Sequence, residues 1–183
     1  MRKTVRYAVA QGLAAGLALT LSACGGDPEP RFEEEPSPTP SEVTSSAPAK
    51  EAWQEKSDDG AVAFVEHWID EFNAMRATGD TEPLRALSDR SCESCTASIA
   101  YTKEIYSSGG ELVTDGWELL QASAPADANS LAPVLGLRVR RSPQVLRESA
   151  EAQPQRFKGG DADYTAYLEW KSGGWIMTRL DLA

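Results

Sequence analysis

Three cysteines and a single histidine carry most of the reactive chemistry in this sequence. Cys24 ends an apolar run, Cys92 and Cys95 lie three residues apart in "RSCESC", and His67 lies between an acid and a tryptophan. Two thiols at this spacing can form a disulfide, act as a redox centre or contribute to a zinc site. The sequence around each thiol favours some of these chemistries over others.

The segment before Cys24 has the organisation of a secretory signal peptide. Arg2, Lys3 and Arg6 precede the short apolar run "AVAQGLAAGLALTLSA", which ends in small residues. Glutamine and glycine interrupt this run, and it is shorter than the roughly 18 to 20 strongly apolar residues that a membrane-spanning helix needs. We therefore expect residues 1–23 to be a signal peptide rather than a transmembrane helix.

The residues Leu21, Ser22, Ala23 and Cys24 resemble the lipobox of bacterial lipoproteins. In that family the cysteine sulfur receives a diacylglyceryl group, and cleavage then leaves the cysteine as the new N-terminus. The resemblance implies lipidation of Cys24. Two or three acyl chains anchor a protein stably, because each buried methylene contributes about 0.8 kcal/mol. We expect the mature protein to be anchored in the cell membrane, on its extracytoplasmic face.

Residues 24–57 have the composition of a disordered linker. They are rich in proline, glutamate and serine and contain few large apolar side chains. Such a segment cannot bury enough surface to offset the entropy of ordering it. About 33 residues at roughly 3.1 Å each give a reach of up to about 100 Å. We expect this linker to lift one folded domain, residues 58–183, off the membrane.

For the pair Cys92 and Cys95, a disulfide is favoured by the oxidising compartment that a secreted chain reaches. Residues three apart on a helical turn lie near the Cα separation of roughly 5 to 6 Å that a disulfide prefers. The alternative is a thioredoxin-like redox centre, but "EPLRALSDR" before the pair predicts a helix where such centres follow a strand. A zinc site would need four ligands. We expect a structural disulfide and no metal.

A second candidate site is the basic cluster formed by Arg138, Arg140, Arg141 and Arg147. The chain carries a net charge of −10, so it is a poor candidate for binding nucleic acid, which depends on Lys and Arg. The cluster could bind an anionic wall polymer or an acidic partner, or it could be a solvated strand face. His67 has no nucleophile placed near it by the sequence, which favours a boundary histidine over a general base.

Helical periodicity predicts three helices in the first part of the domain. The first begins after a cap at Asp58 to Gly60, follows "AVAFVEHWIDEFNAMRATGD" and ends at Gly79. A short helix in "EPLRALS" and a third helix over about residues 91–107 follow. The residues expected to be buried are Val62, Val65, Trp68, Ile69, Phe72 and Met75 in the first helix and Ile99, Thr102, Ile105 and Tyr106 in the third.

After Gly109 and Gly110 the period changes to two, which is typical of strands. We expect "LVTDGWELLQAS" to be broken or bulged near Gly116, "LAPVLGLRVRR" to bury alternate residues, and a further strand near residues 144–148. "YTAYLEW" and "WIMTRLDLA" form a hairpin joined by "KSGG". The residues expected inward are Leu135, Leu137 and Val139, then Tyr164, Ala166, Leu168 and Trp170, then Ile176, Leu180 and Leu182. This predicts an α+β fold with three N-terminal helices on a curved antiparallel sheet of four to five strands.

The stretches "AVAFVEHWIDEFNAMRATGDTEPLRALSDRSCESC" and "YTAYLEWKSGGWIMTRLDL" resemble a family of uncharacterised actinobacterial lipoproteins with a domain of unknown function. That domain is similar to the nuclear-transport-factor-two-like, or ketosteroid-isomerase-like (SnoaL-like), superfamily. The likeness covers roughly residues 59–182 and implies a cone, in which helices close over a strongly curved sheet.

Enzymes of that superfamily place an acid or base and a tyrosine inside the cone. Tyr101, Tyr106, Tyr164, Tyr167 and Asp115 could line such a cavity here, although core tyrosines with satisfied hydroxyls are the ordinary alternative.

Two functions remain open on the sequence. The first is a membrane-tethered extracytoplasmic lipoprotein whose domain binds a small ligand or a cell-envelope protein, without a cofactor and without catalysis. The alternative is an enzyme, either isomerase-like in the cone or a thiol–disulfide redox protein at Cys92 and Cys95.

Overall fold

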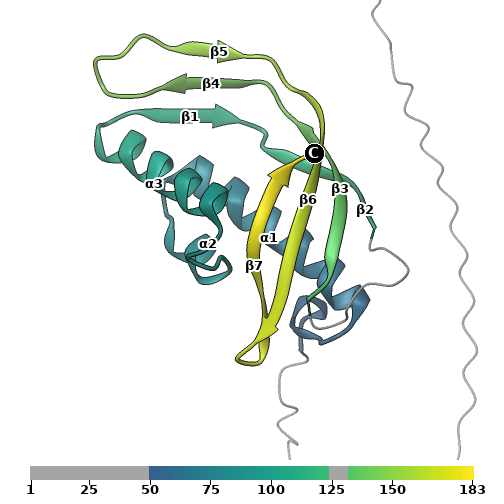
Figure 1. The fold of residues 1–183 in the computed structure, drawn as a ribbon. Helices are drawn as coiled ribbons and strands as arrows, with labels where there is room; N and C mark the ends of the chain where they lie inside the picture. Colours follow the sequence, from purple (N-terminus) through teal and green to yellow (C-terminus); the bar gives the residue numbers. More distant parts are fainter. Residues whose placement is uncertain (1–49, 124–131) are drawn as a thin grey trace, which may run out of the picture. The chain divides into compact units, whose positions relative to one another are not determined.

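The structure, a computed structural model, describes residues 50–123 and 132–183, and residues 46–183 belong to one compact unit. The expected signal peptide, the lipobox and the linker as far as residue 49 lie outside the described residues. The elements are shown in Figure 1. In chain order they are η1 (Ala52–Gln54), α1 (Asp58–Thr78), α2 (Glu82–Ala86), α3 (Glu93–Ser107), β1 (Glu111–Thr114), β2 (Trp117–Ser123), β3 (Val134–Arg141), β4 (Gln144–Arg147), β5 (Gln155–Phe157), β6 (Gly160–Lys171) and β7 (Gly174–Leu182).

The strands form two antiparallel sheets that are joined strand by strand. The smaller sheet has the order β1-β4-β5 and the larger has the order β2-β3-β6-β7. The chain passes from β1 to β2, from β3 to β4 and from β5 to β6 through only two residues each time. Figure 1 shows the two sheets running in different directions from this line of joints. Together they amount to one strongly bent sheet, and the predicted α+β class is confirmed.

Gly116 makes the first of the three bends. Its φ of +89° lies in the left-handed region, which glycine adopts without a steric penalty. A Cβ at this position would lie 2.5 Å from the side-chain amide carbon of Asn73 on α1. The amide N–H of Ser142 donates to the Gly116 carbonyl over 2.9 Å, so the second bend is bonded to the first. The predicted interruption near Gly116 is therefore confirmed.

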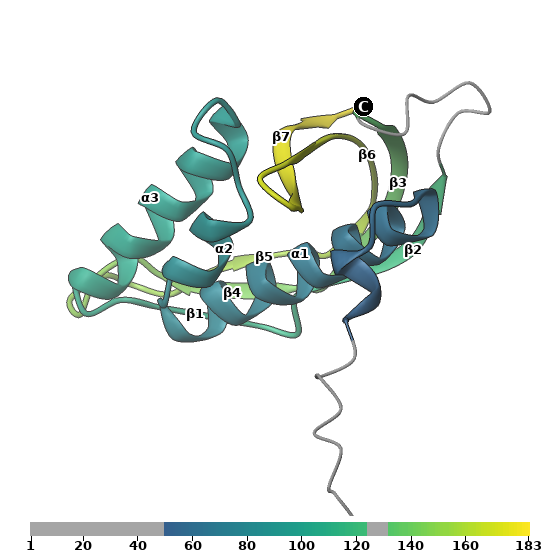
Figure 2. The same cartoon turned by 90° about the horizontal axis from the view of Figure 1, so that it is seen from below.

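The main core lies between α1 and the inner face of the larger sheet. In Figure 2, β7, β6, β3 and β2 follow one another around a curve, with α1 beneath them. The strand residues predicted inward on β3 and β6 are buried or half-buried, and so is the apolar stripe of α1. Gly79 ends α1 with φ +79°, as predicted, whereas the N-cap is Ser57, whose Oγ accepts from the Gly60 N–H over 3.0 Å.

The predicted inward face of β7 is partly wrong. Trp175, Met177 and Leu180 are buried, whereas Ile176 is half-buried and Leu182 is 68 % exposed. The pairing with β6 shifts register between Tyr167 and Leu168, so one extra residue of β7 interrupts the alternation. A bulge of this kind reverses the side on which every later side chain lies, and a strict period of two cannot anticipate it.

The described residues hold seven strands, against the four to five expected. One expected strand, "LVTDGWELLQAS", is divided at Gly116 into β1 and β2. β4 lies where a further strand was expected near residue 144, but β5 was not foreseen. It has three residues, all exposed, so it carries no alternation of apolar and polar side chains that could be detected.

The ordered part of the domain begins before residue 58. The ring of Trp53 in η1 packs against the main core, and the indole N–H of Trp175 donates to the Glu55 carbonyl over 2.7 Å. Residues 52–55, which the sequence places in the linker, therefore pack against the domain. Composition alone does not reveal this, because Trp53 is a single large apolar side chain among charged and polar residues.

Candidate functional site

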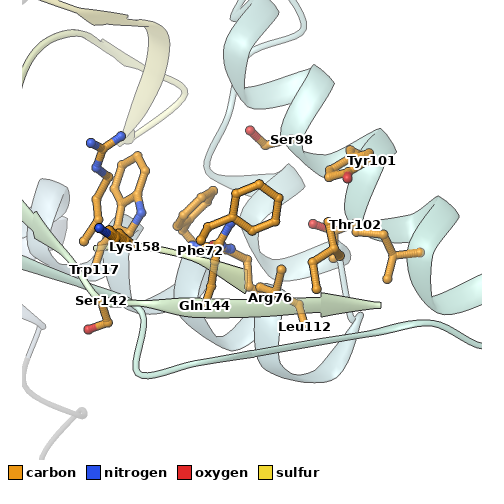
Figure 3. A pocket seen from close by; sticks show the side chains of 14 residues that line it. Phe72, Arg76, Ser98, Tyr101, Thr102, Leu112, Trp117, Ser142, Gln144 and Lys158 are labelled. Atoms are coloured by element: carbon orange, nitrogen blue, oxygen red, sulfur yellow. The ribbon is translucent and has the colours of Figure 1, made fainter. Parts of the chain in front are cut away.

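A cavity of about 510 Å³ lies between α1, α3 and the bend of the sheet. Figure 3 shows Ser98, Tyr101 and Thr102 on α3 at one side and Trp117 and Lys158 at the opposite side. The residues that line it are Phe72, Arg76, Ser98, Tyr101, Thr102, Ile105, Leu112, Trp117, Arg141, Ser142, Gln144, Leu146, Phe157 and Lys158.

The apolar part of the cavity is built around two aromatic rings. The ring centroids of Phe72 and Trp117 lie 4.7 Å apart, and Trp117 packs in turn on Tyr164 at 4.9 Å. Asn73 fixes the backbone of Trp117: its Oδ1 accepts from the Trp117 N–H over 2.8 Å, and its Nδ2 donates to the Trp117 carbonyl over 2.9 Å. One polar side chain on α1 therefore positions the aromatic wall.

Three cations line the same cavity. Arg76 comes from α1, Arg141 ends β3, and Lys158 lies between β5 and β6. Arg76 is half-buried, donates to Oε1 of Gln144 and lies 5.3 Å from the centroid of the Phe72 ring. Burial lowers the pKa of Arg76, because removing the guanidinium from water disfavours its charged form. Among the lining residues that the structure describes, none carries a carboxylate.

The basic cluster expected on β3 is divided between two faces of the sheet. Arg138 and Arg140 lie on the outer face, where Arg138 pairs with Asp161 at 3.6 Å and Arg140 pairs with Glu118 at 3.3 Å and Asp161 at 3.4 Å. Arg141 instead lines the cavity. Arg141 therefore faces away from Arg138 and Arg140, because neighbouring residues of a strand point to opposite faces.

Of the five residues considered as cone-lining groups, only Tyr101 lines the cavity. Its hydroxyl donates to Oε1 of Glu148 over 3.0 Å, and burial together with this bond raises the pKa of Tyr101. The Tyr106 hydroxyl donates to the Arg76 carbonyl over 2.7 Å, and Tyr164 packs against Trp117. The remaining two lie elsewhere: Tyr167 lies 4.7 Å from the Arg179 guanidinium, and Asp115 is exposed at the bend.

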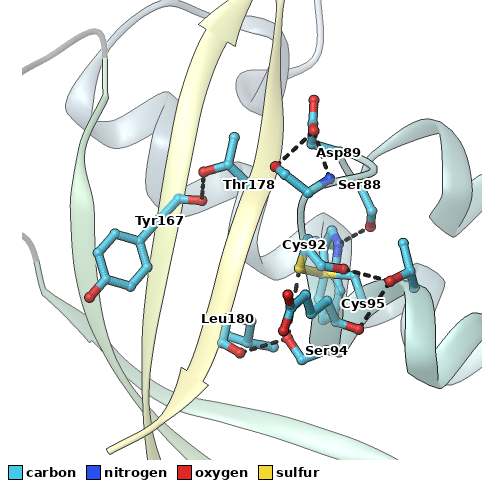
Figure 4. Close-up of a disulfide and its surroundings, with 12 residues drawn as sticks. Ser88, Asp89, Cys92, Ser94, Cys95, Tyr167, Thr178 and Leu180 are labelled. Atoms are coloured by element: carbon cyan, nitrogen blue, oxygen red, sulfur yellow. Dashed lines mark hydrogen bonds between the residues drawn. A yellow bond between two sulfur atoms is a disulfide. The ribbon is translucent and has the colours of Figure 1, made fainter.

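The disulfide between Cys92 and Cys95 is present and lies at the start of α3 (Figure 4). The Cα atoms are 5.3 Å apart, and the two residues are 0 % and 1 % exposed. Next to it, the Ser94 hydroxyl donates to the Leu180 carbonyl of β7 over 2.6 Å. The burial of both sulfurs favours a structural bond over a redox centre, which must meet a partner thiol.

His67 lies at the boundary of the core. Its ring stacks on Trp53, with centroids 4.3 Å apart, and it does not line the cavity. Within residues 50–123 and 132–183, His, Cys, Asp and Glu side chains nowhere gather in the number that a metal site needs. In the same part of the chain, no helix is both long and apolar enough to cross a membrane.

Sequence reasoning missed Arg76, Asn73 and Gln144, although the pattern carried a signal for two of them. Asn73 is a poor helix former in the middle of a long helix, which indicates a hydrogen-bonding role for its side chain. Arg76 follows Phe72 by one helical turn and so lies on the side of α1 that faces the sheet. Gln144 has no comparable signal, because only the bend of the sheet brings it to Arg76.

The helices, the bent antiparallel sheet and the cavity between them form a cone-like α+β domain. The chain belongs to the Family of unknown function (DUF6318), whose model matches residues 46–181. Both findings confirm the resemblance given above for the folded domain. Comparison with curated proteins finds no significant match.

Comparison with solved structures finds similar proteins at low sequence identity. The intermembrane space region of the chloroplast protein ARC6 is 12 % identical with a TM-score of 0.51, over 74 % of this chain and 98 % of that one. A putative scytalone dehydratase from Novosphingobium aromaticivorans is 12 % identical with a TM-score of 0.46, over 67 % and 83 %. An NTF2-like protein with a cystatin-like fold from the same organism is 12 % identical with a TM-score of 0.41, over 67 % and 80 %. These likenesses concern the fold alone.

Proposed function

We propose that the protein is an extracytoplasmic lipoprotein, anchored through Cys24, whose domain binds a small molecule in the cavity between α1, α3 and the bent sheet. The observation that carries this proposal is the cavity itself. Its volume of about 510 Å³ falls within the roughly 300 to 1,000 Å³ of ligand pockets, and it combines aromatic walls with a few convergent polar groups.

The chemistry of the lining supports binding rather than catalysis. Its ionisable side chains are those of Arg76, Arg141, Lys158 and Tyr101. Arginine, lysine and tyrosine each keep one protonation state near neutral pH. Such groups hold and orient a ligand, whereas general acid–base catalysis works best with a group whose pKa lies near the working pH.

The proposal is tested with N-phenyl-1-naphthylamine, an uncharged fluorophore whose emission rises in an apolar site. The protein is the chain from residue 25 onward with its disulfide formed, which contains the whole compact unit of residues 46–183. We expect saturable binding of one dye per chain. Ser98→Trp places a large ring in the cavity and is expected to weaken binding at least about tenfold, since filling a pocket removes the apolar surface that holds a ligand.

The matched control is Ala100→Trp, which adds the same ring at an exposed position of α3 and is expected to leave the affinity unchanged. Circular dichroism establishes that both variants are folded. Absence of saturable binding, or equal affinities in the two folded variants, would contradict the proposed function.

A further inference from the structure

We infer that the ligand of this cavity is an amphipathic anion, with a carboxylate, sulfonate or phosphate group bound by Arg76, Arg141 and Lys158 and an apolar body packed against Phe72, Leu112 and Trp117. This inference builds on the proposed function, since it names the chemical class of the molecule that the cavity takes.

The first argument is the distribution of charge over the domain. The chain has 28 acidic and 18 basic side chains, and six of the fourteen Lys and Arg residues that the structure describes lie within 4 Å of a carboxylate. Arg138, Arg140 and Arg147 lie within 4 Å of one, the last bonded to Glu111 at 3.0 Å. The three cations of the cavity make no such pair with a carboxylate of the described residues. A cluster of unpaired cations on an acidic protein is a favourable place for an anion.

The second argument is the state of Arg76. The guanidinium of Arg76 is partly withdrawn from water. It contacts the Phe72 ring and the side-chain amide of Gln144, and neither of these groups carries a negative charge. Removing a charge from water is costly unless a counter-charge accompanies it. Gln144 occupies one N–H donor and fixes the plane of the group, and the remaining donors suit a bidentate bond to a planar or tetrahedral oxyanion.

The third argument is the apolar surface that lies beside the cations. The carboxylate of Glu148 accepts a hydrogen bond from Tyr101 on α3. Figure 3 shows Tyr101 on the side opposite to Lys158 and Trp117. Lys158 lies on the same side as Trp117, and Arg76 lies 5.3 Å from the centroid of the Phe72 ring, so aromatic surface adjoins the cations. Leu112, with the buried Ile105 and Leu146, supplies further apolar surface. A molecule with one charged end and one apolar end matches this arrangement.

The test compares two dyes with the same ring system. 8-Anilino-1-naphthalenesulfonate is N-phenyl-1-naphthylamine with one added sulfonate. We expect the sulfonate to bind at least about tenfold more tightly, as one charge-assisted hydrogen bond predicts. Arg141→Gln should lower the ratio of the sulfonate's affinity to that of the uncharged dye by about the same factor.

Arg138→Gln is the matched control, because it removes an arginine from the outer face of the same strand and lies outside the cavity. It should change neither affinity. Lys158→Gln provides a second, exposed variant of the cavity, and thermal melting establishes that each variant is folded.

The outcomes separate the two proposals. If both dyes bind equally, or if Arg141→Gln and Arg138→Gln act alike on the sulfonate, the charge class is wrong while the binding cavity stands. If neither dye binds, the inference falls together with the proposed function.

Discussion

Cys92 and Cys95 act through their position at the base of one cavity wall. The disulfide closes at the first turn of α3, and the adjacent Ser94 hydroxyl bonds to the Leu180 carbonyl of β7. The same helix supplies Ser98, Tyr101 and Thr102 to the cavity. The disulfide therefore constrains the start of a helix whose next turns line the cavity.

Replacing both cysteines, Cys92→Ala with Cys95→Ala, is expected to lower the free energy of unfolding by about 2 kcal/mol, as the chain-entropy estimate gives for so short a loop. Thermal unfolding of the oxidised wild type and of the variant measures this difference. The internal control is the reductant, which should lower the melting temperature of the wild type and leave that of the variant unchanged.

Insulin reduction by the wild-type protein decides between the two interpretations of the pair. A structural disulfide gives no activity, since both sulfurs are buried. Activity that disappears in the double alanine variant would instead establish a redox centre and overturn the structural assignment.

The alternation of side chains along a strand explains which cavity residues could be predicted from the sequence. Leu135, Leu137 and Val139 lie inward, and continuing that period by two places Arg141 on the same face. The face on which Arg141 lies could therefore be predicted from the sequence, although its closeness in sequence to Arg138 and Arg140 suggests that the three share one surface. The partnership of Arg76 with Gln144 could not be foreseen, because it depends on a bend that joins residues 68 positions apart.

The bend at Gly116 depends on α1 as well as on the glycine. Two residues separate β1 from β2 there, and at this edge the Trp117 N–H donates to Asn73 Oδ1 while the Trp117 carbonyl accepts from Asn73 Nδ2. The side chain of Asn73 thus forms the hydrogen bonds that a neighbouring strand would form, and these bonds hold α1 and β2 together. The position of Trp117 in the cavity follows from this pairing.

Asn73→Ala is expected to lower the free energy of unfolding by about 1 to 3 kcal/mol, because it leaves two backbone groups of Trp117 without partners in a half-buried position. Chemical denaturation measures the loss, and binding of the dye should weaken as the wall loosens. Asp70→Ala, on the exposed side of the same helix, should change stability by less than about 0.5 kcal/mol. Equal effects of the two substitutions would show that Asn73 does not hold the bend.

The helices and the bent strands differ in how far periodicity reveals them. The apolar stripe of α1 continues through about four turns of one helix, so several residues independently indicate which face is buried. β7 contains a bulge opposite Tyr167 and Leu168, and β5 is an exposed edge of three residues. Pairing with neighbouring strands decides both features, and that information is not local to either segment.

The anchoring of the protein through Cys24 is a separate expectation that the folded domain does not decide. We expect cells grown with labelled palmitate to label the protein, and Cys24→Ala to abolish the label and release the protein from the membrane fraction, because the acyl chains supply the anchoring energy. The double alanine variant of Cys92 and Cys95 is the control: it also loses cysteines but should keep the label. Unlabelled wild type, or label retained by Cys24→Ala, would contradict lipidation.

The attachment of η1 has a mechanical consequence. Trp175 holds the Glu55 carbonyl at 2.7 Å, Trp53 stacks on His67, and Lys50 lies 5.8 Å from the Trp170 ring. A tension applied along the chain from the side of residue 50 is carried first by these contacts, at the start of α1 and the hairpin of β6 and β7. None of these side chains lines the cavity. The side chains that would carry such a load first are therefore different from those that line the cavity.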